Sequence, residues 1–372
     1  MLYSLSMRKR LIVLTGLVIS FAGIYLATSS LAKPIAPAMR IGVMVSDSGS
    51  LYFAGSIQRA AARLAAGDLA ETVKVNLDFE DAGDSVFEAK NAVARLKAFD
   101  AELLLAPIES ETARLVAQLT KDQLPIIATA PLDDDVDAKQ PFIRLTSSDS
   151  QDIISLAELV SRDKPASVLI VHSSDSYGKD IMKSLAFGLT LRGVPKVQVL
   201  GISDITAIKK TRPEVLIVAS MEQSIGFFSS VKDWLPQAGQ MYLVPGNLAN
   251  YTAYPWAKAL KGTKAILPKD PTTAEFRNRL ATSLGRPALL SNPKAPVFAL
   301  AWHTYKGIQL AAQAFLEAKS NNPDALRSAL LNSKTKGEGR FQSSGYLREV
   351  DYTVFSYGVL GSYAPEGVFS PN

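Results

Sequence analysis

The sequence predicts an α/β protein of two lobes with mostly parallel sheets, and three observations lead to this fold class. From Met39 onward, short apolar runs of β type alternate with amphipathic helical runs, the pattern of parallel strands joined by helices. The alternation forms two series, at residues 39–142 and 150–268, and each is too long for one strand-helix-strand unit. The length of 372 residues is sufficient for two domains.

The expected elements follow from hydrophobic periodicity. Strands are expected at residues 40–45, 73–79, 103–106, 125–128, 167–172, 196–200, 215–219 and 240–244. Helices are expected at residues 56–66, 86–98, 110–121, 274–284, 297–318 and 323–332. In the helix at 86–98, four residues share one face that should pack on a sheet: Val86, Ala89, Val93 and Leu96. Further alternating segments follow a glycine-rich turn, at 340–342 and 352–360.

Residues 1–32 have the organisation of an export signal. A basic cluster at 8–10 precedes an apolar run at 11–26, and Ser-Leu-Ala at 30–32 is a small-x-small ending that a signal peptidase accepts. We therefore expect cleavage near Ala32 and a periplasmic protein. The alternative is an N-terminal membrane anchor that is not cleaved, since the apolar run approaches the length of a bilayer span.

The composition excludes several classes of function. The sequence contains no cysteine, which rules out disulfides, thiolate metal ligands and cysteine nucleophiles. The formal charge is +5, and loss of the three basic residues of the N-terminal segment, which has no acids, leaves 5 minus 3, or +2. The other basic residues are scattered singly, so we expect no nucleic-acid partner.

Catalytic and metal-binding signatures are scarce. The sequence has no HExxH, GxSxG, P-loop or GxGxxG motif, and we expect its two histidines, His172 and His303, to be structural. The three aspartates at 133–135 lack the spacing of a calcium loop and predict a solvated turn. Glu109 and Glu111 suit the start of a helix, where acids oppose the positive end of the dipole. We therefore expect no enzyme, no cofactor and no metal.

Three turns rich in small hydroxyl residues follow expected strands, at 46–50, 107–112 and 146–150. In open α/β sheets, ligands gather outside the carboxyl ends of the strands, where helix N-termini offer unpaired amides. The same residue types are also common helix caps. The turns therefore leave two interpretations open, a polar cleft or ordinary capping.

A set of short motifs occurs in a fixed order along nearly all of the chain after the N-terminal segment. They are residues 41–43 with 49–55, Asp78 and Asp81 with the alanine-rich helix that follows, 106–110, 124–127, 142–144 with 148–151, and Asp-Ser-Tyr-Gly at 175–178. Together they resemble the type I periplasmic binding proteins, in particular the leucine/isoleucine/valine-binding group that serves ABC importers. This resemblance implies two Rossmann-like lobes joined by a three-strand hinge and closing over a ligand.

The resemblance also implies domain boundaries. Crossings between the lobes would fall near residues 142–145, near 265–268 and after Gly339. The chain would then divide into a signal peptide at 1–32, a first lobe at 39–144 with 269–336, and a second lobe at 145–268 with 337–366.

The resemblance assigns ligand-binding roles to particular residues. Ser110 matches the serine that holds the ligand carboxylate, assisted by amides of its helix start. Asp149 matches an acid at the start of the second lobe, and Tyr177 matches an aromatic residue that faces the cleft. Ser50, in the hydroxyl-rich turn after the first strand, is a further candidate for ligand binding.

Some positions depart from the pattern of amino-acid binders. Ala130 replaces a hydroxyl residue, and Gly246 or Asn247 replaces the glutamate that pairs with the ligand ammonium. A buried ammonium without its partner would cost several kcal/mol. The ligand could be amino-acid-like or a less polar carboxylate. These replacements favour the less polar carboxylate. Tyr251, Tyr254 and Trp256 could wall such a pocket, although core packing is favoured for at least two of them.

The sequence therefore predicts the solute-binding protein of an ABC importer. We expect a small-molecule ligand, a permease partner in the inner membrane and a monomeric state. The alternative is the same fold used as a regulatory or protein-binding module, such as an activator of a cell-wall synthase.

Overall fold

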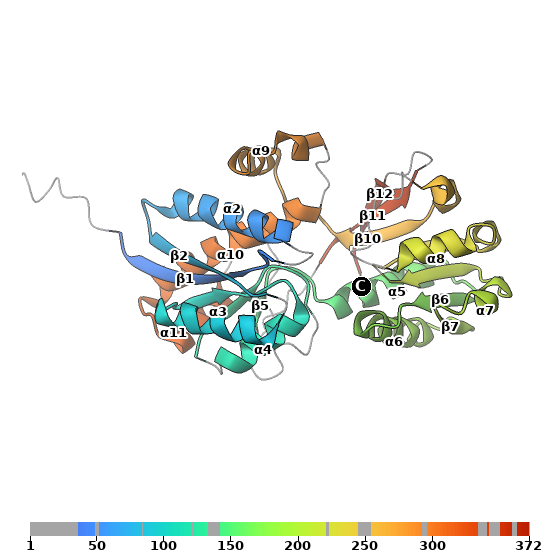
Figure 1. The fold of residues 1–372 in the computed structure, drawn as a ribbon, viewed down its shortest axis with the longest axis horizontal. Coiled ribbons are helices and arrows are strands. Elements are labelled where there is room, and N and C mark those ends of the chain that lie inside the picture. The colour runs from blue at the N-terminus through green and yellow to red at the C-terminus, as the bar shows by residue number, and fades with distance from the viewer. Residues whose placement is uncertain are drawn as a thin grey trace, which may run out of the picture.

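The structure is a computed structural model that describes residues 36–48, 52–83, 85–120, 123–132, 142–220, 223–244, 254–291, 296–333, 341, 350–358 and 363–371. Its helices and strands form two α/β bodies, each built on its own sheet, which we call the first and the second lobe (Figure 1). This confirms the predicted fold class. The export signal at residues 1–32 lies outside the described residues.

The first sheet has five parallel strands in the order β2-β1-β3-β4-β5. They are β1 (Ala38–Val45), β2 (Lys74–Asp81), β3 (Leu103–Leu105), β4 (Ile126–Ala128) and β5 (Ile143–Arg144). The strand order reverses at β1, because β2 lies on one side of it and the later strands lie on the other. In an open α/β sheet, ligands bind outside the strand ends at such a reversal.

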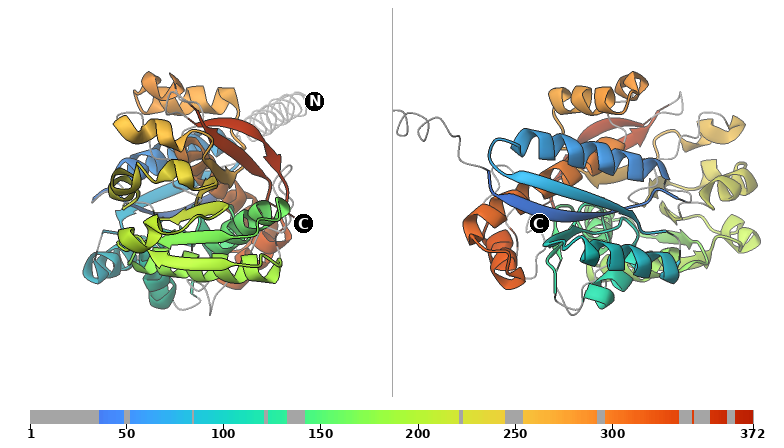
Figure 2. Two further views of the ribbon diagram at one scale, coloured as in Figure 1. Left: turned by 90° about the vertical axis from the view of Figure 1, so that its right-hand side faces the viewer. Right: turned by 60° about the vertical axis from the view of Figure 1, so that its left-hand side comes forward.

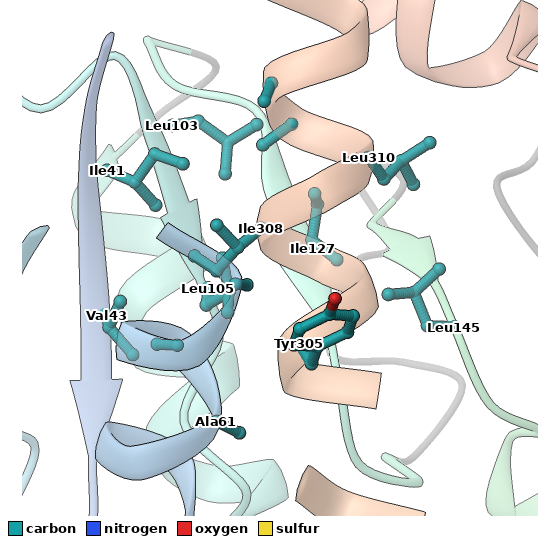
Figure 3. Packing of buried hydrophobic residues seen from close by; sticks show 14 of the residues in the cluster. Ile41, Val43, Ala61, Leu103, Leu105, Ile127, Leu145, Tyr305, Ile308 and Leu310 are labelled. Carbon is teal, nitrogen blue, oxygen red and sulfur yellow. The ribbon is translucent and has the colours of Figure 1, made fainter. Parts of the chain in front are cut away.

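Helices cover both faces of the first sheet. They are α2 (Tyr52–Leu69), α3 (Val86–Ala98), α4 (Ser110–Thr120), α9 (Ala274–Ser283), α10 (Pro296–Ala318) and α11 (Pro323–Asn332). Because successive side chains of a strand point to opposite faces, Leu103 and Leu105 pack with α2 and α10, whereas Leu104 packs with α3 and α4. Figure 3 shows the first of these two cores, where Tyr305 and Ile308 of α10 meet the strands.

The second sheet has seven strands in the order β12-β11-β10-β9-β8-β6-β7. They are β6 (Val168–His172), β7 (Val197–Gly201), β8 (Val215–Ala219), β9 (Gln240–Leu243), β10 (Lys264–Pro268), β11 (Tyr352–Tyr357) and β12 (Tyr363–Phe369). The five strands from β10 to β7 run parallel, and β11 and β12 are antiparallel additions at one edge.

Helices also cover both faces of the second sheet. The α-helices are α5 (Asp149–Arg162), α6 (Ser176–Leu191), α7 (Ile205–Lys209) and α8 (Ser224–Val231), and the 3-10 helices nearby are η3 (Leu235–Gln237) and η4 (Pro255–Leu260). α5 and α6 pack on one face, whereas α7, α8 and the two 3-10 helices pack on the other. The 3-10 helix η5 (Pro287–Ser291) lies next to α9.

The chain passes between the lobes three times. The passages lie between β5 and α5, between β10 and α9, and between α11 and β11. The Lys269 N–H donates to the Asp351 carbonyl at 2.8 Å, which joins the second passage to the third. The boundary near residue 336 lies outside the described residues, so the full set of domain limits stays a prediction.

Two sequence expectations need correction. Val86 was expected on the buried face of its helix but is 59% exposed, because it is the first residue of α3, and Ala92 is buried instead. The helix expected from residue 56 begins at Tyr52. β12 had no sequence signal, since Pro365 and Gly367 are weak strand formers that an edge strand tolerates.

Candidate functional site

The carboxyl ends of the strands in the two sheets face each other. β1 begins at the far end of the first lobe and runs toward the second, as Figure 1 and the right view of Figure 2 show. The other strands of this sheet are parallel to β1 and end at the same edge. α5 leads away from the first crossing, so β6 returns toward the first lobe. A ligand between the lobes would meet strand ends and helix starts from both sides.

Two predicted site residues, Ser110 and Ala130, lie at neighbouring positions of the first-lobe edge. β3 and β4 are adjacent, with Leu105 opposite Ile127. Ser110 is the first residue of α4, which follows β3, and Ala130 follows β4. Both are half-buried. The first N–H groups of α4 have no acceptor within the helix and carry partial positive charge, which suits an anion.

The turn after β1 is fixed by charged residues. Asp81, at the end of β2, accepts hydrogen bonds from the N–H groups of Asp47 and Gly83, each at 3.1 Å. Burial alone would raise the pKa of Asp81, but these bonds and those from Ser48 outweigh it and hold the pKa below its usual value. Arg59 of α2 pairs with Asp47. The predicted site residue Ser50 belongs to this turn but lies outside the described residues.

The turn after β5 is a helix cap. The Ser148 hydroxyl accepts the Gln151 N–H at 3.2 Å, and the Gln151 side chain accepts the Ser148 N–H at 2.9 Å, which is a capping box. For Ser148, the structure therefore supports ordinary capping. Asp149 is the first residue of α5, is half-buried, and donates its N–H to the Leu132 carbonyl at 3.4 Å. This bond ties the start of the second lobe to the chain that follows Ala130.

Tyr177 lies in the first turn of α6, at the edge of the second sheet where β6 ends. The Asp175 side chain caps this helix by accepting the Gly178 N–H at 2.7 Å and the Ser173 hydroxyl at 3.0 Å. A Cβ atom at Gly178 would lie 2.1 Å from the Ser173 hydroxyl oxygen, so this turn requires glycine. The backbone thus positions Tyr177 at this edge, and the orientation of its side chain lies outside the described structure.

Four further residues were candidates for the pocket wall: Asn247, Tyr251, Tyr254 and Trp256. Asn247 and Tyr251 lie outside the described residues, beyond the end of β9. Trp256 is 8% exposed and belongs to the core of the second lobe, where Tyr254 stacks on it at 5.0 Å between ring centroids. These two aromatic side chains are therefore core residues.

A buried polar cluster at the hinge had no sequence signal. The Tyr352 hydroxyl, at the start of β11, donates to the Asp152 carboxylate of α5 at 2.8 Å, and the Ser147 hydroxyl faces both groups. Burial raises the pKa of Asp152 to about 7 and raises that of Tyr352 as well. The cluster joins residues from two of the three crossings, which lie 200 positions apart in the chain.

His303 lies where α10 passes the end of β4. Its ring donates a hydrogen bond to the Thr129 carbonyl, and its burial lowers its pKa to about 4. The sequence predicted a structural role for His303, and its bond to the Thr129 carbonyl is a contact with the backbone of the first lobe. The position beside Ala130 was not foreseen, because residues 129 and 303 are far apart in the sequence.

The described residues hold no group of three or more histidine, cysteine, aspartate or glutamate side chains that could bind a metal ion. None of the helices in the described residues has the apolar length needed to cross a membrane.

Comparison with known proteins identifies the family. The sequence profile of the periplasmic binding protein family matches residues 38–349. The chain belongs to this family, as the ordered motifs predicted. The comparison with curated protein sequences gives no match.

Solved structures share the fold. A leucine-binding protein from Thermotoga maritima has a TM-score of 0.71 at 16% identity, covering 90% of this chain and 99% of that chain. A branched-chain amino acid ABC transporter periplasmic ligand-binding protein from Burkholderia xenovorans has a TM-score of 0.72 at 14% identity, with 90% and 96% covered. An ABC transporter solute-binding protein from Rhodopseudomonas palustris, in complex with 3,4-dihydroxybenzoic acid, has a TM-score of 0.69 at 16% identity, with 90% and 97% covered.

Proposed function

We propose that the chain is the extracytoplasmic solute-binding protein of an ABC importer and binds a small carboxylate between its lobes. The observation that carries this proposal is the position of Ser110. The Ser110 hydroxyl group and the N-terminal end of α4, with its partial positive charge, stand together at the first-lobe edge that faces the second lobe. This is a ready site for one carboxylate group.

The ligand class follows from the residues around Ser110. Ala130 offers a methyl group beyond the end of the neighbouring strand, so this position lacks the hydroxyl group that could bind a polar ligand head. Similar solved structures include a leucine-binding protein and one in complex with 3,4-dihydroxybenzoic acid, so the preference rests on this chain's own residues, Ala130 and the missing glutamate at Gly246 or Asn247. We therefore place less polar carboxylates ahead of α-amino acids.

Transport defines the partners and the location. We propose export, cleavage near Ala32, a monomeric state and delivery of the ligand to an inner-membrane permease. The protein would perform no reaction, because its task is to bind a solute and release it to the permease. An intact mass that begins at Lys33 would support cleavage, whereas the full-length mass in the membrane fraction would support an anchor.

Ligand binding can be tested by thermal unfolding of protein expressed from the full sequence and purified after export. The panel would contain carboxylates, amino acids and amides. A ligand at about 100 times its Kd stabilises the native state by about 2.7 kcal/mol and raises the melting temperature by a few degrees. A panel in which no compound moves the melting curve would contradict the proposal and favour a protein-binding module.

The Ser110→Ala variant tests the site itself. We expect its Kd for the best carboxylate to rise about tenfold, because one hydrogen bond to a charged group is lost. Ser230→Ala, on an exposed face of α8, is the control and should bind as the wild type does. An unchanged Kd in Ser110→Ala would remove Ser110 from the site.

A further inference from the structure

His303 is positioned against the end of β4 by two contacts. Its ring donates to the Thr129 carbonyl. One helical turn further along α10, a Cβ atom at Gly307 would lie 3.4 Å from the Thr129 side chain, so α10 passes directly over this strand end. Thr129 immediately precedes Ala130, which places the imidazole beside the proposed ligand site.

His303 and Ser110 approach this edge from opposite faces of the first sheet. α10 packs on one face with α2, and α4 packs on the other face with α3. β3 and β4 are neighbours in the sheet, so the helix start at Ser110 and the strand end at Thr129 are adjacent. Ala130, with its short side chain, directly follows Thr129 at this edge.

The environment of His303 defines what the ring can do. The imidazole is neutral at physiological pH, because burial lowers its pKa to about 4. In a neutral imidazole one ring nitrogen carries the proton and the other carries a free electron pair. The protonated nitrogen donates to the Thr129 carbonyl, which leaves the second nitrogen as a hydrogen-bond acceptor. His303 is half-buried as a residue, so it is not sealed off from the edge of the sheet.

The hydroxyl group of Thr129, at the end of β4, is a second polar group with unused hydrogen-bonding capacity. The Thr129 hydroxyl is buried, with its residue 1% exposed, and has no hydrogen-bond partner in the described part of the chain. Buried polar groups in native proteins are nearly always paired. The end of β4 thus has more hydrogen-bonding capacity than the described residues use.

We propose that His303 is a specificity residue of the ligand site and accepts a hydrogen bond from a hydroxyl group of the bound carboxylate. The inference rests on the proposed function. It narrows the ligand to hydroxylated carboxylates, which bind with the carboxylate at Ser110 and a hydroxyl group at His303. An ammonium group is a poorer donor here, because the surroundings that keep the imidazole uncharged also disfavour a cation.

The test uses pairs of acids that differ by one hydroxyl group. The probes are benzoate and 4-hydroxybenzoate, phenylacetate and 4-hydroxyphenylacetate, and 4-methylpentanoate and 2-hydroxy-4-methylpentanoate, with leucine as the ammonium probe. Calorimetric titration would give Kd for the wild type, His303→Leu and His303→Gln. Gln313→Leu, further along α10 where Gln313 contacts Glu317, is the control.

In the wild type, the hydroxylated member of at least one pair should bind about tenfold more tightly than its partner. In His303→Leu this preference should fall to about twofold or less, while the Kd of the member without the hydroxyl group stays within about threefold. His303→Gln, which keeps an acceptor, should retain part of the preference, and Gln313→Leu should retain all of it.

The outcomes separate the two proposals. If the acids bind but the hydroxyl preference is absent, or survives in His303→Leu, the role of His303 is wrong and the solute-binding function stands. The same holds if leucine binds most tightly. If no probe binds the wild type, both proposals fail.

A spectroscopic readout covers the case in which the variants do not fold. The sequence has two histidines, so a ¹⁵N-histidine spectrum of the wild type contains the ring signals of His172 and His303 alone. The hydroxylated acid should move one ring nitrogen of His303 and leave His172 in place. A ligand that binds without moving the His303 signals overturns the inference.

Discussion

Asp152 makes the stability of the hinge depend on pH. Its pKa is raised to about 7 in the folded protein, above the value near 3.8 expected when unfolded. The folded state therefore binds the proton more tightly. Stability from this group is fully present below about pH 4 and is lost as the pH rises through about 7. The full effect would be about 4 kcal/mol in the free energy of unfolding.

The Asp152→Asn variant should remove this dependence. Between about pH 5 and 8, the free energy of unfolding of the wild type should fall relative to that of the variant, measured by urea unfolding at several pH values. His303, whose pKa is lowered to about 4, titrates in both proteins and cancels in this comparison. In this pH range the titration of Asp68 and Asp81 does not affect stability, because their pKa values are lowered and they titrate at more acidic pH. Parallel pH profiles for the two proteins would show that Asp152 does not titrate there.

Glu111 should weaken the binding of anions at the start of α4. It is an exposed acid in the first turn, close to the amides that we assign to the ligand carboxylate. Glu111→Gln should therefore lower the Kd of a bound carboxylate about two- to fivefold at low salt, and less at high salt. The matched control is Glu275→Gln, an exposed acid in the first turn of α9. Equal effects of the two variants would place the anion away from α4.

The start of α6 depends on one glycine. In Gly178→Ala the new Cβ would meet the backbone oxygen and nitrogen of Ser173 at 2.7 and 2.8 Å, and backbone atoms cannot rotate away. We expect a loss of about 2 kcal/mol or more in the free energy of unfolding. Gly226→Ala, inside α8 with nothing within 4 Å, should be neutral or slightly stabilising. Similar melting temperatures for the two variants would contradict the close packing at Ser173.

Sequence periodicity predicted the bounds of a helix well where its apolar residues recur at helical spacing and pack on the sheet. The bounds of the helix at 86–98 and of the helix at 323–332 agree with the structure, because each has apolar residues at helical spacing. β11 was expected over 352–360 and ends at Tyr357. The antiparallel partner β12 was not foreseen, because pairing with β11 sets its conformation rather than its own propensity.

The candidate site was predictable only in part. Ser110 and Ala130 follow neighbouring strands, and parallel strands end at one edge, so their proximity can be inferred from the sequence. The contacts of Asp152 with Tyr352 and of His303 with Thr129 join residues from distant parts of the chain. No local pattern encodes such pairs, because the hinge and the return of α10 to the first lobe bring them together.

The whole molecule consists of two lobes with separate hydrophobic cores. The first core includes residues from β1 to β5 and from α9 to α11, and the cores of the second lobe include none of these elements. Three crossings connect the lobes, and the bond between Lys269 and Asp351 joins two of them. This arrangement suits rotation of the lobes as rigid bodies about the crossings.

If the ligand contacts both lobes, its binding must favour the closed arrangement, because a ligand shifts a conformational equilibrium toward the state that it binds better. Small-angle X-ray scattering should then show a smaller radius of gyration with saturating ligand. Ser110→Ala, studied at the same concentration of ligand, should show a smaller decrease because less of it is bound. If the wild type binds with measurable affinity and its radius of gyration does not change, the ligand is held by one lobe, and Tyr177 of the second lobe has no part in the site.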